Sequence, residues 1–77
     1  MTTETIIQPA IKGYRQLTSE EAAQMNEIKS LGEQLGDLVA TLRQVPEYDQ
    51  RWVSIGATDL QRGLMALTRA VARPTTF

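Results

Sequence analysis

The stretch "TSEEAAQMNEIKSLGEQLGDLVATLRQVP", Thr18 to Pro46, has the pattern of one long amphipathic helix. Its large apolar residues are Met25, Ile28, Leu31, Leu35, Leu38 and Leu42. The last five are spaced three, four, three and four residues apart, which is the alternation of a coiled-coil seam. Thr18 and Glu21 form a capping box, and Pro46 disfavours helical geometry in the residue before it. We therefore expect a first long helix over residues 18–45.

A second helix follows with almost no linker. Pro46 suits the first turn of a helix, so we expect this one over residues 47–72, ended by Pro74. Gly56 and Gly63 each cost about 1 kcal/mol relative to alanine inside a helix, which is most easily explained if another backbone or a ligand comes close there. The predicted apolar stripe of this helix is Trp52, Ile55, Leu60, Leu64, Leu67 and Val71.

These elements predict an all-α fold in a single helical domain, residues 1–77. A short N-terminal arm or helix, residues 1–17, precedes the two long helices, and the short connection makes those helices an antiparallel pair. A pair of helices encloses little core, and a chain without cysteine has no disulfide to stabilise it. We therefore expect the remaining apolar faces to meet other subunits in a compact homo-oligomer.

The composition excludes several classes of function. Neither cysteine nor histidine occurs, so there is no cysteine nucleophile and no metal site built on these ligands. The formal net charge of −1 argues against binding to duplex nucleic acid, which needs a basic face. No segment resembles a signal peptide or a membrane span of about 20 apolar residues. Without a nucleophile–histidine set or a phosphate-binding loop, we expect no catalytic residues, no metal and no cofactor.

Tyr14 and Lys29 are the first candidate binding residues. The ring of Tyr14 either packs the arm against the first helix or stacks on a planar ligand, with Lys12 and Arg15 beside it for negative charge. Lys29 either forms a weak surface pair with Glu33 or contacts a phosphate at the edge of a subunit interface. The residues alone leave both alternatives open.

Arginines of the second helix are the next candidates. Arg62 and Arg69 are seven residues apart and so lie on nearly the same helix face. They are either solvent-facing or, in a symmetric oligomer, a cluster of cations that requires an anion. Trp52 belongs to the apolar stripe, and we expect it in the core rather than against a ligand.

The sequence resembles the small phage anti-CBASS proteins that act as cyclic-nucleotide sponges. The resemblance covers residues 11–77 and is carried by the order and spacing of several segments. They are "KGYR" before the cap, "NEIK" in the first helix, "RW" after the turn, and "GLMALTRAVA" before Pro74.

The resemblance implies a homohexamer in the cytoplasm of the host bacterium that binds cyclic di- and trinucleotides without cleaving them. It implies that Tyr14 stacks on a base and Lys29 contacts phosphate in a dinucleotide pocket between chains. It also implies a separate trinucleotide pocket that uses Arg69 and a hydroxyl from Ser30. The alternative, from the residues alone, is a helical protein-interaction module that docks through its coiled-coil-like seam.

Overall fold

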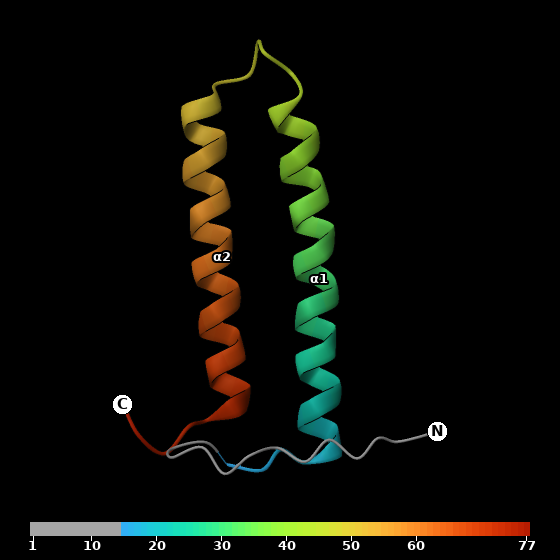
Figure 1. Ribbon diagram of the computed structural model, residues 1–77, viewed down its shortest axis with the longest axis vertical. Helices are drawn as coiled ribbons and strands as arrows, with labels where there is room; N and C mark the ends of the chain where they lie inside the picture. The colour runs from blue at the N-terminus through green and yellow to red at the C-terminus, as the bar shows by residue number, and fades with distance from the viewer. Residues whose placement is uncertain (1–14) are drawn as a thin grey trace.

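The computed structural model describes residues 15–77, which form two antiparallel α-helices joined by a short turn (Figure 1). Helix α1 is Ser19–Arg43 and helix α2 is Gln50–Ala72. The predicted all-α class and the antiparallel pair are confirmed. Most of the arm, residues 1–14, lies outside the described residues.

The start of α1 follows from its capping box. The Glu21 backbone N–H donates to Thr18 Oγ1 at 3.1 Å, and the Thr18 N–H donates to Glu21 Oε1 at 2.9 Å. These two bonds satisfy donors that a helix start would otherwise leave unpaired. The helix ends at Arg43, two residues before the expected boundary at Val45. The Val45 N–H donates to the Leu42 carbonyl at 3.3 Å, a bond between residues three apart that forms a turn and does not continue the α-helix.

Helix α2 begins at Gln50 and not near Pro46. Asp49 is its N-cap, and Oδ1 of Asp49 accepts from the backbone N–H groups of Arg51 at 3.1 Å and Trp52 at 3.3 Å. A carboxylate that accepts two N–H bonds at the positive end of a helix fixes the starting residue more strongly than a proline does. Proline lacks an N–H and only tolerates the first turn, which is why the expected start was three residues too early.

The turn is held by Gln50. Its Nε2 atom donates to the carbonyls of Leu42 at 3.2 Å and Val45 at 3.0 Å. The last carbonyls of a helix have no partner within the helix, so this amide replaces bonds that the end of α1 lacks. Arg43 adds a contact between the helices, because its Nη1 donates to Ser54 Oγ at 3.2 Å.

The face of α1 that packs on α2 differs from the predicted seam. The half-buried positions of this face are Met25, Ile28, Gly32, Leu35, Val39 and Leu42. Leu31 and Leu38, which the spacing placed in the seam, are 48% and 50% exposed. A helix of 3.6 residues per turn allows either set, and the small residue at position 32 selects the observed one. A Cβ added at Gly32 would lie 3.3 Å from Leu64 Cδ1, so the Leu64 side chain packs tightly against α1 at this glycine.

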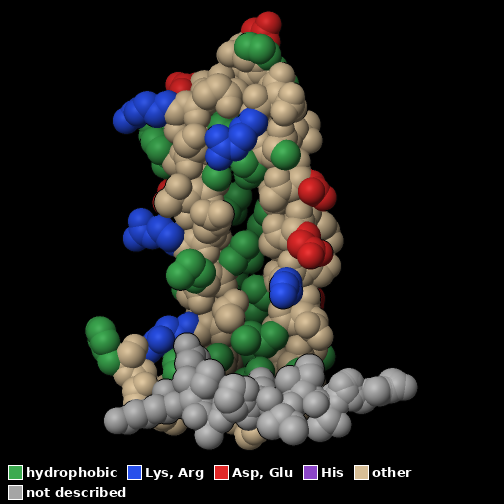
Figure 2. Space-filling view, in the orientation of Figure 1, with side chains coloured by type: hydrophobic (Ala, Val, Ile, Leu, Met, Phe, Trp, Pro, Cys, Tyr) green, Lys and Arg blue, Asp and Glu red, His purple; other side chains and the backbone are tan. Residues whose placement is uncertain are grey.

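Trp52 and Leu67 are also misplaced by the sequence pattern. They are 60% and 57% exposed, so neither lies between the helices of a single chain. No residue of the described part of the chain is fully buried. Figure 2 shows apolar side chains between the helices that remain visible from outside. The single hairpin therefore has an interhelical contact but no closed core.

Two glycines of α2 are not required by packing within the chain. A Cβ at Gly56 or Gly63 would meet nothing within 4 Å, and the same is true of Gly36 on α1. The close approach that was inferred at Gly56 and Gly63 is therefore not made inside one hairpin.

No helix that the structure describes is long and apolar enough to cross a membrane.

Candidate ligand-binding groove

An open groove of about 760 Å³ runs across one face of the hairpin. Its apolar lining comes from both helices and consists of Met25, Ile28, Gly32, Leu64, Met65, Ala72 and Pro74. Its polar lining consists of Asn26, Lys29, Glu33, Thr68 and Arg69. A mainly apolar hollow with a few polar groups is the usual form of a small-molecule site.

Two of the predicted site residues line this groove. Lys29 comes from the middle of α1 and Arg69 from the last turns of α2, and both side chains line it. Their assignment to two separate pockets came from the family resemblance, and the single chain places them on one groove. Within residues 15–77 neither cation forms an ion pair. With Glu33 also in the lining, the groove holds two cations and one carboxylate beside a mainly apolar surface, and this excess of positive charge suits an anion that carries flat apolar groups.

The other two predicted site residues do not join the groove. Ser30 is exposed on α1 and is not among the lining residues of the described part of the chain. Tyr14 lies outside the described residues. Asn26 and Thr68 line the groove and were missed by sequence reasoning. Asn26 lies three residues before Lys29 on the same helix face, which was the available signal.

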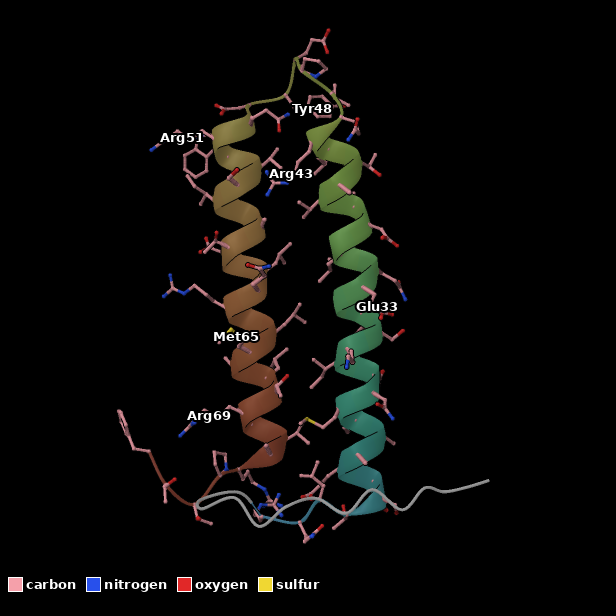
Figure 3. All side chains as sticks on the ribbon, viewed as in Figure 1. Glu33, Arg43, Tyr48, Arg51, Met65 and Arg69 are labelled. Carbon is pink, nitrogen blue, oxygen red and sulfur yellow. The ribbon has the colours of Figure 1, made fainter. Side chains whose placement is uncertain are left out.

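Arg69 also contacts two residues that follow α2, Thr76 and Phe77. Its Nη2 atom donates to the carbonyl of Phe77 at 3.0 Å and more weakly to that of Thr76 at 3.4 Å. Figure 3 shows Arg69 projecting from the side of α2 that faces away from α1. The two carbonyls occupy one nitrogen of the guanidinium and leave its other N–H groups for a ligand.

A cluster of charges joins the ends of the two helices next to the groove. Glu21 Oε2 accepts from Arg15 Nη2 at 2.9 Å and from Arg73 Nη2 at 2.5 Å. Arg73 closes α2 in the left-handed region, with φ of 45°, a conformation that favours glycine. The hydrogen bond from Arg15, followed by those from the Thr18 N–H and Arg73, lowers the pKa of Glu21 from 4.5 to about 2.

The same cluster corrects the interpretation of Arg15. This residue was considered as a cation for a ligand beside Tyr14, but its guanidinium is turned into the protein. Arg15 Nη2 donates to Glu21 and, at 3.2 Å, to the carbonyl of Val71. Sequence reasoning assigned Glu21 to the start of the first helix, as part of the capping box and as a charge that suits the positive end of the helix dipole. An antiparallel pair brings the acidic start of one helix to the basic end of the other, and that charge pattern could have indicated the contact.

Trp52, the second aromatic candidate, lies in the first turn of α2, at the opposite end of that helix from Arg69. The guanidinium carbon of Arg51 lies 5.5 Å from the ring centroid of Trp52, within the range of a cation–π contact. Trp52 is therefore an exposed residue covered in part by arginine, and the expectation that it belongs to the core of the chain is wrong.

The fold and the groove together define a small helical-hairpin protein with a cationic, partly apolar binding face. The chain belongs to the Acb2/Tad1 family: the model of the family described as "Acb2/Tad1, hairpin domain" matches residues 8–72. Among curated proteins it is similar to Anti-CBASS protein 2 of Pseudomonas phage JBD67. The two are 31% identical over an alignment that covers 83% of this chain and 91% of that protein.

Proposed function

We propose that this protein sequesters cyclic di- and trinucleotide second messengers in the cytoplasm of a bacterial host and thereby blocks CBASS anti-phage signalling. The similarity to an anti-CBASS protein of a phage supports the assignment to this signalling pathway. The proposed class of ligand rests on the groove, whose mainly apolar lining includes the cations Lys29 and Arg69. A cyclic oligonucleotide presents this combination of phosphates and flat bases.

In this proposal the protein binds without turnover. Tyr14 stacks on a base, and Lys29 supplies the charge for a phosphate of the cyclic dinucleotide. Arg69, with Ser30, serves the cyclic trinucleotide. Stacking on an aromatic ring is worth about 1–3 kcal/mol per base and tolerates any base, which suits a protein that must hold several related messengers. Affinity and abundance are sufficient for sequestration, so no catalytic group is required.

The proposed active form is a homo-oligomer, a hexamer by analogy with the family. Four exposed leucines support further association: Leu31, Leu38, Leu60 and Leu67. None of them lines the groove. At 3.6 residues per turn their helical phase places them on the opposite side of the hairpin, and we call this set the back face. Burying the back face between chains leaves the groove side available for a ligand.

Calorimetric titration of the full chain tests the ligand and the sites together. The dinucleotide probe is cyclic GMP–AMP, which offers both purine bases, and the trinucleotide probe is cyclic tri-AMP. Tyr14→Ala and Lys29→Ala are expected to weaken cyclic GMP–AMP binding by about 10-fold or more, since 1.4 kcal/mol is a factor of ten. Arg69→Ala is expected to weaken cyclic tri-AMP selectively.

Arg62→Ala is the matched control for Arg69→Ala. Arg62 is an exposed arginine of the same helix, seven residues earlier, and it does not line the groove. Its loss should leave both affinities unchanged. Unaltered cyclic GMP–AMP affinity in both the Tyr14 and the Lys29 variants would remove the dinucleotide site assignment.

The second candidate function is a protein-interaction module, which the exposed Trp52 and the leucines of the back face favour. A thermal-shift assay separates the two, because a ligand that binds the folded state raises the melting temperature by mass action. A rise with cyclic GMP–AMP or cyclic tri-AMP supports sequestration. No rise with either nucleotide, at concentrations up to the millimolar range, would favour the interaction module.

A further inference from the structure

One carboxylate, that of Glu33, lies among the cations of the groove. Glu33 lines the groove together with Lys29, four residues earlier on α1, and Arg69 of α2. In the part of the chain that the structure describes, every ion pair involves Glu21, so neither cation of the groove is paired with Glu33. The carboxylate therefore remains open to a ligand that enters the groove.

A carboxylate is unfavourable in a groove for phosphates unless the ligand also brings hydrogen-bond donors. Ionised glutamate only accepts hydrogen bonds, and like charges that are brought together repel. The bases of a cyclic dinucleotide carry donors on their edges. Guanine presents two adjacent donors, N1–H and the exocyclic N2–H, which match the two oxygens of a carboxylate. Adenine presents one donor, its exocyclic N6–H, beside the acceptor N1, which repels a carboxylate.

We propose that Glu33 sets the base preference of the groove: its carboxylate accepts hydrogen bonds from N1–H and N2–H of a guanine base. This inference rests on the proposed function and specifies which messengers are favoured, namely those that contain guanine. Messengers that contain only adenine still bind through their phosphates and through the apolar lining, but less tightly.

The position of Lys29 suits this assignment. Residues four apart on a helix share a face, with their Cβ atoms about 5–6 Å apart. A phosphate on Lys29 and a base edge on Glu33 are then close enough to belong to one nucleotide. The two side chains bind opposite kinds of group on the ligand, so they do not need to pair with each other.

The α2 side of the groove offers a surface for the flat face of the same base. Met65 lines the groove and is 70% exposed, so most of its side chain is not packed within the hairpin. Figure 3 shows Glu33 on α1 and Met65 on α2 at a similar level along the hairpin. A thioether makes favourable contacts with aromatic rings. An acceptor on one helix and an apolar surface on the other therefore supply both parts of a base-binding subsite.

Calorimetric titration of the full chain with cyclic di-GMP and cyclic di-AMP tests this preference. The two probes share the same ring, sugars and charge and differ only in their bases. The original chain is expected to bind cyclic di-GMP about 10-fold more tightly, in the lower part of the range for a bidentate base contact because Glu33 is exposed. Glu33→Gln replaces one acceptor oxygen by an amide donor, so the two affinities should then agree within about threefold.

Asp37→Asn is the matched control. It removes the same charge one turn further along α1, at an exposed position that does not line the groove. The ratio of the two affinities should keep its original value in this variant. Glu33→Ala is the second test variant, since alanine is the best helix former and provides no acceptor at all. It should lose the preference for cyclic di-GMP as Glu33→Gln does.

Two results would overturn the role of Glu33 while sequestration stands. One is equal affinity of the original chain for cyclic di-GMP and cyclic di-AMP. The other is an unchanged ratio in folded Glu33→Gln or Glu33→Ala, which would mean that the carboxylate does not contact the base. If the original chain binds no cyclic dinucleotide and no cyclic tri-AMP, the proposed function itself has failed, and that result is visible before any variant is made.

Discussion

Arg69 donates a hydrogen bond of 3.0 Å from Nη2 to the backbone oxygen of Phe77, so the proposed trinucleotide residue is already engaged by a residue that follows α2. Removing Thr76 and Phe77 frees that nitrogen. We expect cyclic tri-AMP to bind about 2- to 10-fold more tightly, because one hydrogen bond contributes about 0.5–1.5 kcal/mol net. Calorimetry of the truncated chain measures the change.

The matched control for the truncation is Phe77→Ala. The Phe77 ring is fully exposed, and this variant removes it while retaining both backbone carbonyls. Its affinity for cyclic tri-AMP should equal that of the original chain. An unchanged affinity in the truncated chain would show that Thr76 and Phe77 do not compete with the nucleotide.

The carboxylate of Glu21 predicts a specific dependence of stability on pH. Its pKa is lowered from 4.5 to about 2 in the folded chain, chiefly by Arg15. A group with a depressed folded pKa stabilises the protein above its unfolded pKa and loses that contribution as the pH falls through the folded value. The stability difference between the original chain and Glu21→Gln should therefore be full at about pH 7 and shrink between about pH 4.5 and 2.

Urea unfolding at fixed protein concentration measures this difference. Glu20→Gln is the control, because Glu20 is the neighbouring exposed acid in the first turn of α1 and forms neither of the Glu21 ion pairs. If the stability difference between the original chain and Glu21→Gln does not depend on pH, the charge of Glu21 does not hold the helix ends together.

The back face predicts that association depends on its leucines. Leu38→Glu places a charge on this surface and should lower the mass of the particle in sedimentation, since an unpaired charge in an apolar interface is strongly unfavourable. Ala40→Glu adds the same charge to an exposed position on a different side of α1 and should retain the original mass. Loss of association in Ala40→Glu with retention in Leu38→Glu would place the interface elsewhere.

Gly32 should be the glycine that is least tolerant of a side chain within the hairpin. A Cβ there already lies 3.3 Å from Leu64 Cδ1, so Gly32→Val is expected to destabilise the fold by about 1–3 kcal/mol through overpacking. Gly36→Ala, with nothing within 4 Å, is expected to be neutral or stabilising by up to about 1 kcal/mol. Urea unfolding of both variants gives the comparison, and equal stability of the two would contradict the observed helix register.

Local signals in the sequence predicted the helices well and their packing less well. The Thr18–Glu21 capping box and the proline after α1 act within one turn of backbone, so they could be read directly. Whether Leu31 or Gly32 faces α2 depends on how closely the two helices pack. The sequence pattern of α1 alone does not determine that distance. The Asp49 cap was missed because a proline three residues earlier offered a second plausible start.

The candidate site was predictable only in part for the same reason. Lys29 and Arg69 were identified from the sequence, but their meeting on one groove depends on the pairing of α1 with α2. The contact of Arg15 with Val71 joins residues 56 positions apart, beyond any local pattern. Tyr14 lies outside the described residues, so its role stays a prediction.

Recovery of the bound nucleotide tests the central claim most directly. The protein is incubated with cyclic GMP–AMP, separated from free nucleotide, denatured by heat, and the released material is identified by mass spectrometry. Sequestration predicts intact cyclic GMP–AMP in a fixed ratio to protein, and much less from the Lys29→Ala variant. Linear nucleotide, or no nucleotide retained with the protein, would contradict the account.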